Sequence, residues 1–250
     1  MAKITTIIDI GSNSMRMVVF KKTSRFGFHL VNESKSKVKI SEGCYENSGN
    51  LQELPMKRAF NALESFLQIA KNLKSRKIIC VATSALRDAP NKKEFISKVS
   101  KELKLNIKVI DGTKEAYFGG VAARNLIDCD DFTTVDIGGG STEFAFIDNG
   151  NIVDTISLNI GTVRIKELYF DKSDLDGAKN YIESELSKIN KNLPTIVGLG
   201  GTARAISKII LEKDNYPLDL LHAFSYKVKS NLPLMQNIIE ASSESELKSL

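Results

Sequence analysis

TTVDIGGGSTEF, residues 133–144, and its near copy TTIIDIGSNSMRM, residues 5–17, are the stretches that decide the fold. Each is a β-branched run that ends in an aspartate (Asp136 or Asp9), passes through a turn and continues as a second strand-like run. The pattern therefore predicts a β-hairpin twice in one chain. A duplicated fold whose two turns face one another has a cleft between its halves, and such clefts are favoured ligand sites.

Strand-like and helix-like patterns alternate along the rest of the chain. Phe60, Leu63 and Leu67 recur at three- and four-residue steps, which is the spacing of an amphipathic helix. Strands are expected at residues 4–10, 15–20, 78–83, 106–110, 132–137, 142–148, 152–158 and 195–199, with further short strands and loops after residue 20. Helices are expected at residues 54–73, 91–103, 111–126, 161–170 and 175–190, and after GGTAR at 200–204.

This alternation predicts an α/β protein built on a repeated plan. The chain has 250 residues, the length of one large or two medium domains. We expect two similar α/β domains, residues 1–125 and residues 126–250, on either side of a central cleft.

The composition narrows the class of partner. No apolar run approaches the ~18 residues that a membrane span needs, so no membrane partner is expected. MAKITTIID at the N-terminus lacks the layout of a signal peptide, which favours a cytoplasmic location. The net charge of +5 and the pI near 8.9 suit an anionic partner. Basic residues are not interleaved with aromatic ones, so a nucleic acid duplex is not expected.

The cysteines and histidines do not suggest a metal centre. Cys44, Cys80 and Cys129 are far apart and form no C-x-x-C pair, so we expect reduced, structural thiols. His29 and His222 each stand alone, which argues against a zinc site built on histidine.

The two hairpin turns carry the chemistry that the sequence suggests. Glycines let backbone N–H groups approach an anion closely, and successive amides in such turns form an anion-binding nest. Asp9 and Asp136 would face one another across the cleft, with Glu143 on the outgoing strand of the second hairpin. Such oxygen ligands suit Mg²⁺ that is shared with substrate phosphates. One such turn alone is more often an ordinary hairpin, but two matched copies favour the phosphate site.

A third glycine turn, GLGGTARA at residues 198–205, lies between a predicted strand and a predicted helix. The unpaired amides at a helix N-terminus make an anion site, and Arg204 adds a positive charge one turn later. The alternative is a turn that needs glycine only for its geometry. The turn is neither a Walker A loop nor a G-x-G-x-x-G fingerprint.

Six motifs in this order resemble the exopolyphosphatase / guanosine pentaphosphate phosphohydrolase family: DIGSNSMRM, ATSALRDAPN, DGTKEAYFGG, DIGGGSTEF, NIGTVRIKELYF and GLGGTARA. The resemblance covers nearly the entire chain. It implies a duplicated ribonuclease H-like (actin-type ATPase) fold with mixed five-stranded sheets. It also implies Mg²⁺-dependent hydrolysis that releases the terminal phosphate of inorganic polyphosphate, of guanosine pentaphosphate, or of both.

The resemblance also assigns roles to individual residues. Glu115 matches the catalytic carboxylate of the family, and Arg87 matches the arginine that holds a substrate phosphate. The acids linked to magnesium are Asp9, Asp136 and Glu143. The residues that it assigns to substrate phosphate are Ser12, Asn13 and Ser14 of the first turn and Gly138, Gly139, Gly140 and Ser141 of the second. The anion site expected at the third turn adds Gly200, Gly201 and Thr202. For Arg16 and Arg164, contact with phosphate and bracing of the two halves both stay open.

Each assignment has a less specific alternative. Glu115 could be a solvated helix acid, and Arg87 could merely pair with Asp88. A kinase of the same superfold is a second enzyme hypothesis, and a non-catalytic sensor of guanosine alarmones or polyphosphate is the alternative from another class. A homodimer could form through the helical part of the surface.

The resemblance also shows a difference near the end of the chain. Larger members of the family add a helical domain after the duplicated unit. Here the polar, helix-like stretch SSESELKSL, residues 242–250, comes where the second half of the family usually adds another strand and helix. We therefore expect either a fragment of a longer protein or a trimmed second domain with an open sheet edge.

Overall fold

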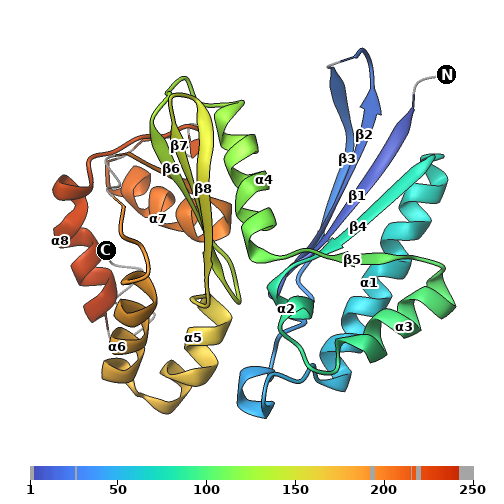
Figure 1. Ribbon diagram of the computed structural model, residues 1–250, viewed down its shortest axis with the longest axis horizontal. Coiled ribbons are helices and arrows are strands. Elements are labelled where there is room, and N and C mark those ends of the chain that lie inside the picture. Colours follow the sequence, from blue (N-terminus) through green and yellow to red (C-terminus); the bar gives the residue numbers. More distant parts are fainter. Residues whose placement is uncertain (1–2, 26, 192–194, 215, 218–220, 242–250) are drawn as a thin grey trace.

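Two α/β halves stand side by side, each built on one mixed sheet (Figure 1). The protein is represented by a computed structural model that describes residues 3–25, 27–191, 195–214, 216–217 and 221–241. The predicted α/β class and the repeated plan are confirmed. The polar stretch predicted as helix-like at residues 242–250 lies outside the described residues.

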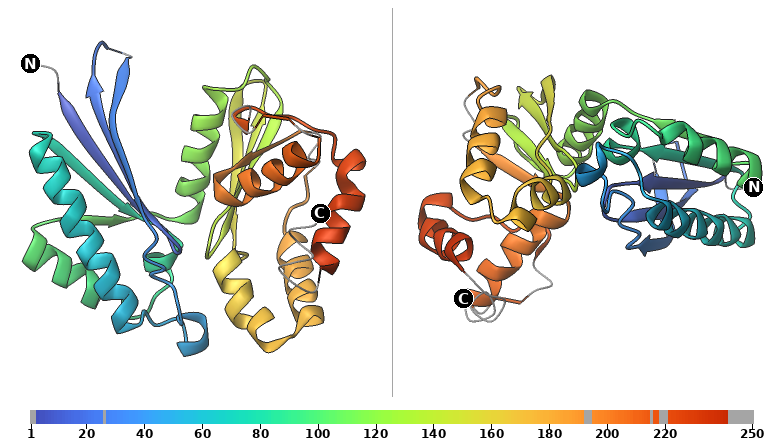
Figure 2. Two further views of the ribbon diagram at one scale, coloured as in Figure 1. Left: turned by 180° about the vertical axis from the view of Figure 1, so that it is seen from behind. Right: turned by 90° about the horizontal axis from the view of Figure 1, so that it is seen from below.

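The first sheet has five strands in the order β3-β2-β1-β4-β5. β1 pairs antiparallel with β2 and parallel with β4, so the predicted hairpin opens the sheet. Helices α1 and α3 cover one face of the sheet (Figures 1 and 2), where Ile8 and Ile10 pack with Leu63 and Phe95 in one core. The elements are β1 Ile4–Ile10, β2 Met15–Lys22, β3 Phe28–Ser36, α1 Glu53–Asn72, β4 Lys77–Ala82, α3 Lys92–Leu103 and β5 Ile107–Val109.

The second sheet repeats this order as β8-β7-β6-β9, with β6 in the place of β1. β6 pairs antiparallel with β7 and parallel with β9, as β1 does with β2 and β4. Five strands were predicted, whereas the described residues form four, because no described strand pairs with the outer side of β9. The strands are β6 Phe132–Ile137, β7 Thr142–Asp148, β8 Asn151–Leu158 and β9 Ile196–Leu199.

The remaining helices follow the prediction in part. The predicted helices of the second half are present as α5, α6 and α7, but α2 and α8 were not predicted. α2 is a single turn, and α8 contains Pro233, which in a sequence pattern argues against a helix. The bounds are α2 Ser84–Arg87, α5 Thr162–Leu168, α6 Leu175–Leu186, α7 Gly200–Lys213 and α8 Val228–Glu240, with short 3₁₀ turns η1 Tyr45–Asn47 and η2 Phe170–Lys172.

Helix α4, Gly112–Arg124, packs on the second sheet although it was predicted as part of residues 1–125 (Figures 1 and 2). Its small residues allow this close contact, since Ala123 belongs to the same core cluster as Ala145 and Ile147 of β7. Division by packing therefore places the change from one half to the other near the start of α4. If the halves are instead divided by the repeated strand order, the boundary falls after α4, in agreement with the predicted domains of residues 1–125 and 126–250.

We expect Gly120→Ala to destabilise the protein by about 1–3 kcal/mol, because the new methyl group would be overpacked. A Cβ at Gly120 would lie 2.8 Å from the Ala145 Cβ and 3.0 Å from the Ile152 Cδ1. Gly119→Ala is the matched control: its Cβ would meet only the flexible end of Leu199 at 3.2 Å, and alanine favours the helix. The midpoint of urea unfolding should fall for the first variant and not for the second. Equal midpoints for both would contradict this packing of α4.

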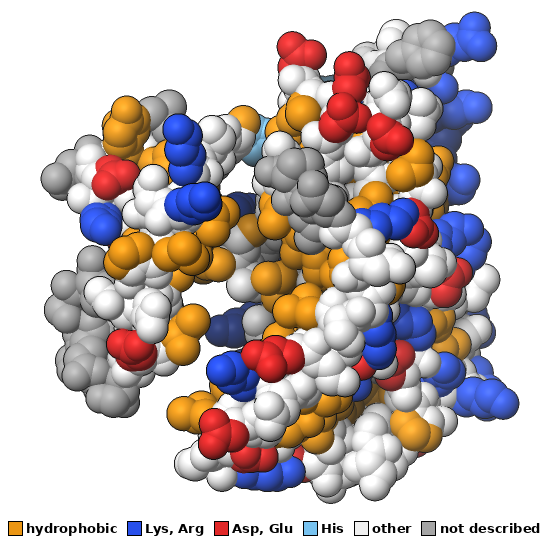
Figure 3. All heavy atoms as spheres, turned by 60° about the vertical axis from the view of Figure 1, so that its left-hand side comes forward, with side chains coloured by type: hydrophobic (Ala, Val, Ile, Leu, Met, Phe, Trp, Pro, Cys, Tyr) orange, Lys and Arg blue, Asp and Glu red, His pale blue; other side chains and the backbone are white. Residues whose placement is uncertain are grey.

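The far side of the second half exposes apolar side chains. Ile196 of β9 and Val228, Leu232 and Ile239 of α8 are all more than half exposed. Hydrophobic side chains surround a hollow on this side of the molecule (Figure 3). None of the described helices is both long enough and apolar enough to cross a bilayer.

The predicted thiols are free in the described residues. Cys44 and Cys80 are buried, and Cys129 is partly buried. Burial raises the pKa of Cys44 to about 11 and that of Cys80 to about 12, which keeps both in the thiol form.

Candidate active site between the two halves

A cleft of about 690 Å³ lies between the halves and collects the predicted site residues. Among the predicted site residues, Arg87 alone does not line the cleft. It contacts three residues that do line it: Glu115, Ser141 and Glu143. The lining residues that were predicted are Asp9, Ser12, Asn13, Ser14, Glu115, Asp136, Gly138, Gly139, Gly140, Ser141, Glu143, Gly200, Gly201 and Thr202. Residues that are far apart in the sequence therefore share one space.

The two hairpins present equivalent positions to the cleft. Asp9 lies directly opposite Arg16 across β1 and β2, and Asp136 lies opposite Glu143 across β6 and β7. Side chains of such cross-strand pairs point to the same face of the sheet. The turns match as well, because the Gly11 N–H donates to the Ser14 carbonyl at 3.2 Å and the Gly138 N–H donates to the Ser141 carbonyl at 2.9 Å.

The second turn, which we call the second phosphate loop (residues 138–141), has its carbonyls held by α5. The N–H groups of Thr162 and Val163 donate to the carbonyls of Gly138 and Gly139 at 3.0 and 2.8 Å. The Arg164 Nε donates to the Gly140 carbonyl at 2.8 Å. In a trans peptide the following N–H points the opposite way. The N–H groups of residues 139–141 thus point away from these donors, and none has an acceptor among the described residues.

The first phosphate loop, residues 11–14, is held in a similar way from behind. The Lys39 N–H donates to the Asn13 carbonyl at 2.9 Å, and the Ser41 N–H donates to the Ser12 carbonyl at 3.2 Å. The amides that follow these carbonyls, those of residues 13 and 14, have no acceptor in the described part of the chain. Both loops therefore offer unpaired N–H groups, which is the arrangement of an anion nest.

The two loops approach closely only because the second contains glycine. A Cβ at Gly139 would lie 2.8 Å from the Ser12 Cβ. A Cβ at Gly140 would lie 2.1 Å from the Ser84 Oγ and 2.6 Å from the Tyr45 hydroxyl. These two glycines thus let the second half touch the first half beside the cleft.

Glu115 and Arg87 meet where α4 and α2 converge. The Arg87 Nη1 donates to the Glu115 Oε2 at 2.9 Å, and the Arg87 Nη2 lies 3.3 Å from the Ser141 Oγ and 3.9 Å from the Glu143 Oε1. The side chains of Arg87 and Glu115 are only 19% and 23% exposed. Glu115 is in the first turn of α4, whose N-cap Asp111 accepts from the Lys114 N–H at 2.7 Å. The arginine therefore connects the candidate base to the second phosphate loop.

The carboxylates of the cleft are buried close to one another. Burial and the nearby Asp136 raise the pKa of Asp9 to about 6, and the Arg16 guanidinium opposes this rise. Burial raises the pKa of Asp136 as well. Burial and the charge of Glu143 raise the pKa of Glu115. Asp9, Asp136 and Glu115 are thus held in sites that disfavour their negative charge, a condition typical of functional sites.

This donor set fits a hard divalent cation. Among the described lining residues, five are acids (Asp9, Glu33, Glu115, Asp136 and Glu143) and three are bases (Arg16, Lys35 and Arg204). A bound cation would offset the burial and the mutual repulsion that raise the pKa values of Asp9 and Glu115. No three acids, histidines or cysteines of the described residues form a compact metal cage. Mg²⁺ in proteins is commonly held by one or two carboxylates together with water and substrate phosphate, so the arrangement suits it.

The third glycine turn opens α7 at the edge of the cleft. Gly200 has a φ of +76° and begins the helix, and its Cβ, if present, would lie 2.3 Å from the Asp136 Oδ1. The Thr202 Oγ1 donates to the Ile137 carbonyl at 3.0 Å. The N-terminus of α7 and Asp136 are therefore neighbours, and the charge of Arg204 opposes the rise in the pKa of Asp136.

Several residues that line the site had no role predicted from the sequence. Arg16 lines the cleft and pairs with Glu33 at 2.5 Å. Its place opposite Asp9 was readable, because Arg16 follows Asp9 at the same interval as Glu143 follows Asp136. Thr83 and Ser84 also line the cleft; they stand in the motif ATSALRDAPN, in which a role was predicted only for Arg87.

The sequence comparisons identify related proteins. Residues 18–250 match the profile of the Ppx/GppA phosphatase family. The chain is 33% identical to a "Bifunctional 3-dehydroquinate synthase/phosphatase" of Fusobacterium nucleatum, over 97% of this chain and 40% of that protein. It is 32% identical to a "Guanosine-5'-triphosphate,3'-diphosphate pyrophosphatase" of Photobacterium profundum, over 82% of this chain and 43% of that one. The chain thus covers less than half the length of each of these two curated relatives.

Solved structures share the fold. A Ppx/GppA family member from Aquifex aeolicus superposes with a TM-score of 0.68 at 28% identity, over 87% of this chain and 72% of that one. An exopolyphosphatase from Cytophaga hutchinsonii superposes with a TM-score of 0.76 at 26% identity, over 85% of this chain and 72% of that one. Both matches include the two halves that form the cleft, because each covers more than four-fifths of this chain.

Proposed function

Because the chain belongs to the Ppx/GppA phosphatase family, we propose that it is a Mg²⁺-dependent hydrolase of phosphoanhydrides. Its substrate is inorganic polyphosphate, guanosine pentaphosphate, or both, and its product is the terminal phosphate. The observation that carries this proposal is the pair of unpaired amide nests that face buried carboxylates across one cleft. The names of the Photobacterium and Cytophaga proteins indicate guanosine pentaphosphate and polyphosphate, respectively, as substrates of those proteins.

A terminal phosphoanhydride suits this cleft for electrostatic reasons. Its several negative charges repel an incoming hydroxide, so catalysis requires charge neutralisation and in-line placement of the attacking water. The amides of both phosphate loops and the Arg87 guanidinium supply donors for the phosphate oxygens. The excess of acids over bases in the lining would repel such a substrate without a cation. The proposal therefore includes Mg²⁺, with Asp9, Asp136 and Glu143 as the residues that would hold it.

Glu115 is the proposed general base. In the free protein it is paired with Arg87, and a substrate phosphate that accepts from Arg87 would compete for the same guanidinium. Glu115 could then orient a water and accept its proton. The water oxygen forms the new bond to the terminal phosphorus, the bridging P–O bond breaks, and the shortened substrate leaves with its electron pair. Bound Mg²⁺ would neutralise charge on the phosphate oxygens.

We expect the protein to release phosphate from long polyphosphate, tripolyphosphate or guanosine pentaphosphate, and a side-by-side measurement of kcat/KM will rank them. Removal of Mg²⁺ with EDTA should abolish the release, and added Mg²⁺ should restore it. Release from none of the three substrates in Mg²⁺ would contradict the proposed function. Release that is unchanged in EDTA would contradict the cation site.

Two further measurements separate the alternatives. Tight calorimetric binding of guanosine pentaphosphate without turnover would favour a sensor. Phosphate transfer to a small alcohol or carboxylate in place of water would favour a kinase.

A further inference from the structure

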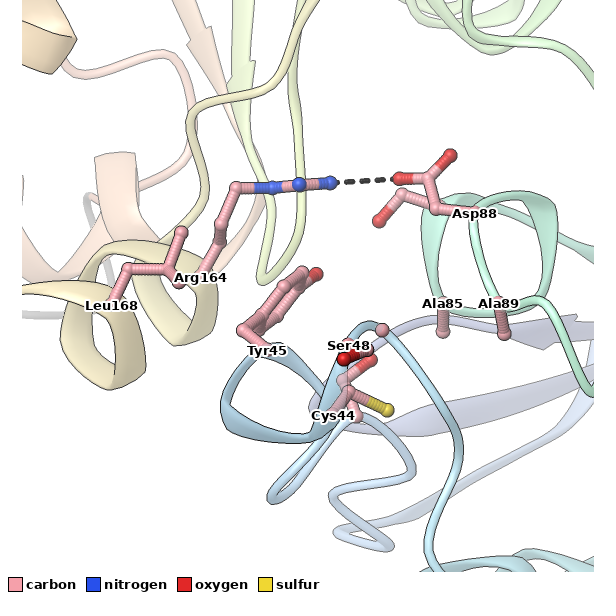
Figure 4. A pocket seen from close by; sticks show the side chains of 11 residues that line it. Cys44, Tyr45, Ser48, Ala85, Asp88, Ala89, Arg164 and Leu168 are labelled. Carbon is pink, nitrogen blue, oxygen red and sulfur yellow. Dashed lines mark hydrogen bonds and ion pairs between the residues drawn. The ribbon is translucent and has the colours of Figure 1, made fainter.

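The Arg164 side chain extends from helix α5 of the second half to the first half (Figure 4). Its Nη2 donates to the Asp88 Oδ2 at 2.8 Å, and its guanidinium lies over the ring of Tyr45, 4.6 Å from the centroid. Asp88 follows α2 and Tyr45 begins η1, so both partners belong to the first half. The Arg164 side chain is only 14% exposed, which shields these contacts from water.

The same guanidinium also holds the second phosphate loop. Its Nε donates to the Gly140 carbonyl at 2.8 Å, alongside the α5 amides that hold the two preceding carbonyls. Arg164 therefore fixes the direction of the Ser141 N–H, which belongs to the same peptide unit as the Gly140 carbonyl. The planar fork of arginine suits such a double task, because its donors have a fixed geometry.

Asp88 links Arg164 to the arginine of the site. The Asp88 Oδ2 accepts from Arg164, while the Asp88 Oδ1 lies 3.4 Å from the Arg87 Nε. One carboxylate thus faces two guanidinium groups, one from each half. Arg87 continues the chain of contacts to Glu115 and to the Ser141 hydroxyl.

A second contact from α5 keeps the helix against the first half. The Glu167 carboxylate accepts from the N–H groups of Gly43 and Tyr45 at 2.8 and 3.0 Å. Glu167 lies one turn after Arg164, so both side chains project from the same side of α5. Two side chains, Arg164 and Glu167, therefore hold α5 against the first half. Of these two, Arg164 also contacts the second phosphate loop.

We propose that Arg164 is a positioning residue that aligns the second phosphate loop of one half with Arg87 of the other. The inference rests on the proposed function, since alignment matters when one phosphate must meet both groups. Arg164 reaches the reaction through the Gly140 carbonyl and through Asp88. Its loss should therefore lower kcat with little effect on KM, because misplaced donors penalise the transition state most.

The kinetic test compares Arg164→Gln, Arg164→Lys and Asp88→Asn with wild type. Arg164→Gln should lower kcat by about 10- to 100-fold and change KM by less than roughly threefold. Arg164→Lys should not restore kcat, because an ammonium cannot reproduce the fork. Asp88→Asn leaves one side-chain oxygen to accept from two guanidinium groups. The double variant that combines Arg164→Gln with Asp88→Asn should be no slower than the slower of these two single variants. Lys166→Gln is the control, since Lys166 of the same helix pairs with Asp171 of the second half.

Hydrogen–deuterium exchange supplies a readout that does not need activity. Arg164→Gln should speed exchange in residues 138–142 and in residues 84–88 of the other half, while Lys166→Gln should leave both unchanged. Unchanged kcat, or additive losses in the double variant, would overturn the proposal. If wild type releases no phosphate, the proposed function fails, and the exchange measurement still decides: faster exchange in both segments supports the alignment, and unchanged exchange overturns it.

Discussion

The Glu115→Gln variant is expected to release phosphate about 10³-fold more slowly than wild type, in the range that loss of a general base produces. The amide has nearly the shape of the carboxylate and can still accept from the Arg87 Nη1 through its oxygen. It cannot take a proton from water. The quantity to measure is kcat for phosphate release at saturating substrate and Mg²⁺.

Two controls separate a catalytic loss from a structural one. Glu64→Gln replaces an exposed glutamate of α1 and should keep full kcat. The unfolding midpoint of Glu115→Gln should not fall, because burial disfavours the charge that the substitution removes. Full activity in Glu115→Gln would exclude the assigned base, and a large drop in its midpoint would indicate that Glu115 has a structural role.

The hairpins and their acids could be predicted because the signals are local. A β-branched run, an aspartate and a glycine turn fix strand, register and turn within about a dozen residues. The equivalence of Asp9 and Asp136 follows from the repeat alone. Glu115 and Arg87 were different: neither has a pattern of its own that marks it, and only the resemblance of the surrounding motifs singled them out.

Tertiary contacts account for what the sequence could not show. The apolar side of α4 predicts a helix that packs against a neighbouring element. It does not predict that this element is the second sheet, where Gly120 lies close to Ala145. The contact between Gly140, Ser84 and Tyr45 joins three segments with no shared pattern. The roles of Arg16 and Arg164 stayed open for the same reason. In the structure Arg16 lines the cleft, whereas Arg164 joins the halves.

The Arg87→Gln variant is expected to lose about 10³-fold in kcat, comparable with removal of an arginine that stabilises transferred phosphate. Arg87 is the cation that contacts Glu115 and the Ser141 hydroxyl at once, at 2.9 and 3.3 Å. Without it, a phosphate in the second loop lacks its charged donor. The acids Glu115 and Glu143 also lose a neutralising neighbour, so the pKa of each should rise further.

Arg87→Lys tests whether charge alone is sufficient. A lysine ammonium is a single point of charge, so it cannot contact Glu115, Ser141 and Asp88 together as the guanidinium does. The lysine variant should therefore recover only a small part of the lost kcat, while Arg124→Gln at the exposed end of α4 should remain fully active. Full recovery by lysine would show that Arg87 acts through charge and not through its geometry. Because Arg87→Gln should raise the pKa of Glu115, and Glu115 must lose its proton to act as the base, the rise of kcat with pH should move to higher pH in this variant than in wild type. An ascending limb at the same pH as in wild type would show that Arg87 does not control the ionisation of Glu115.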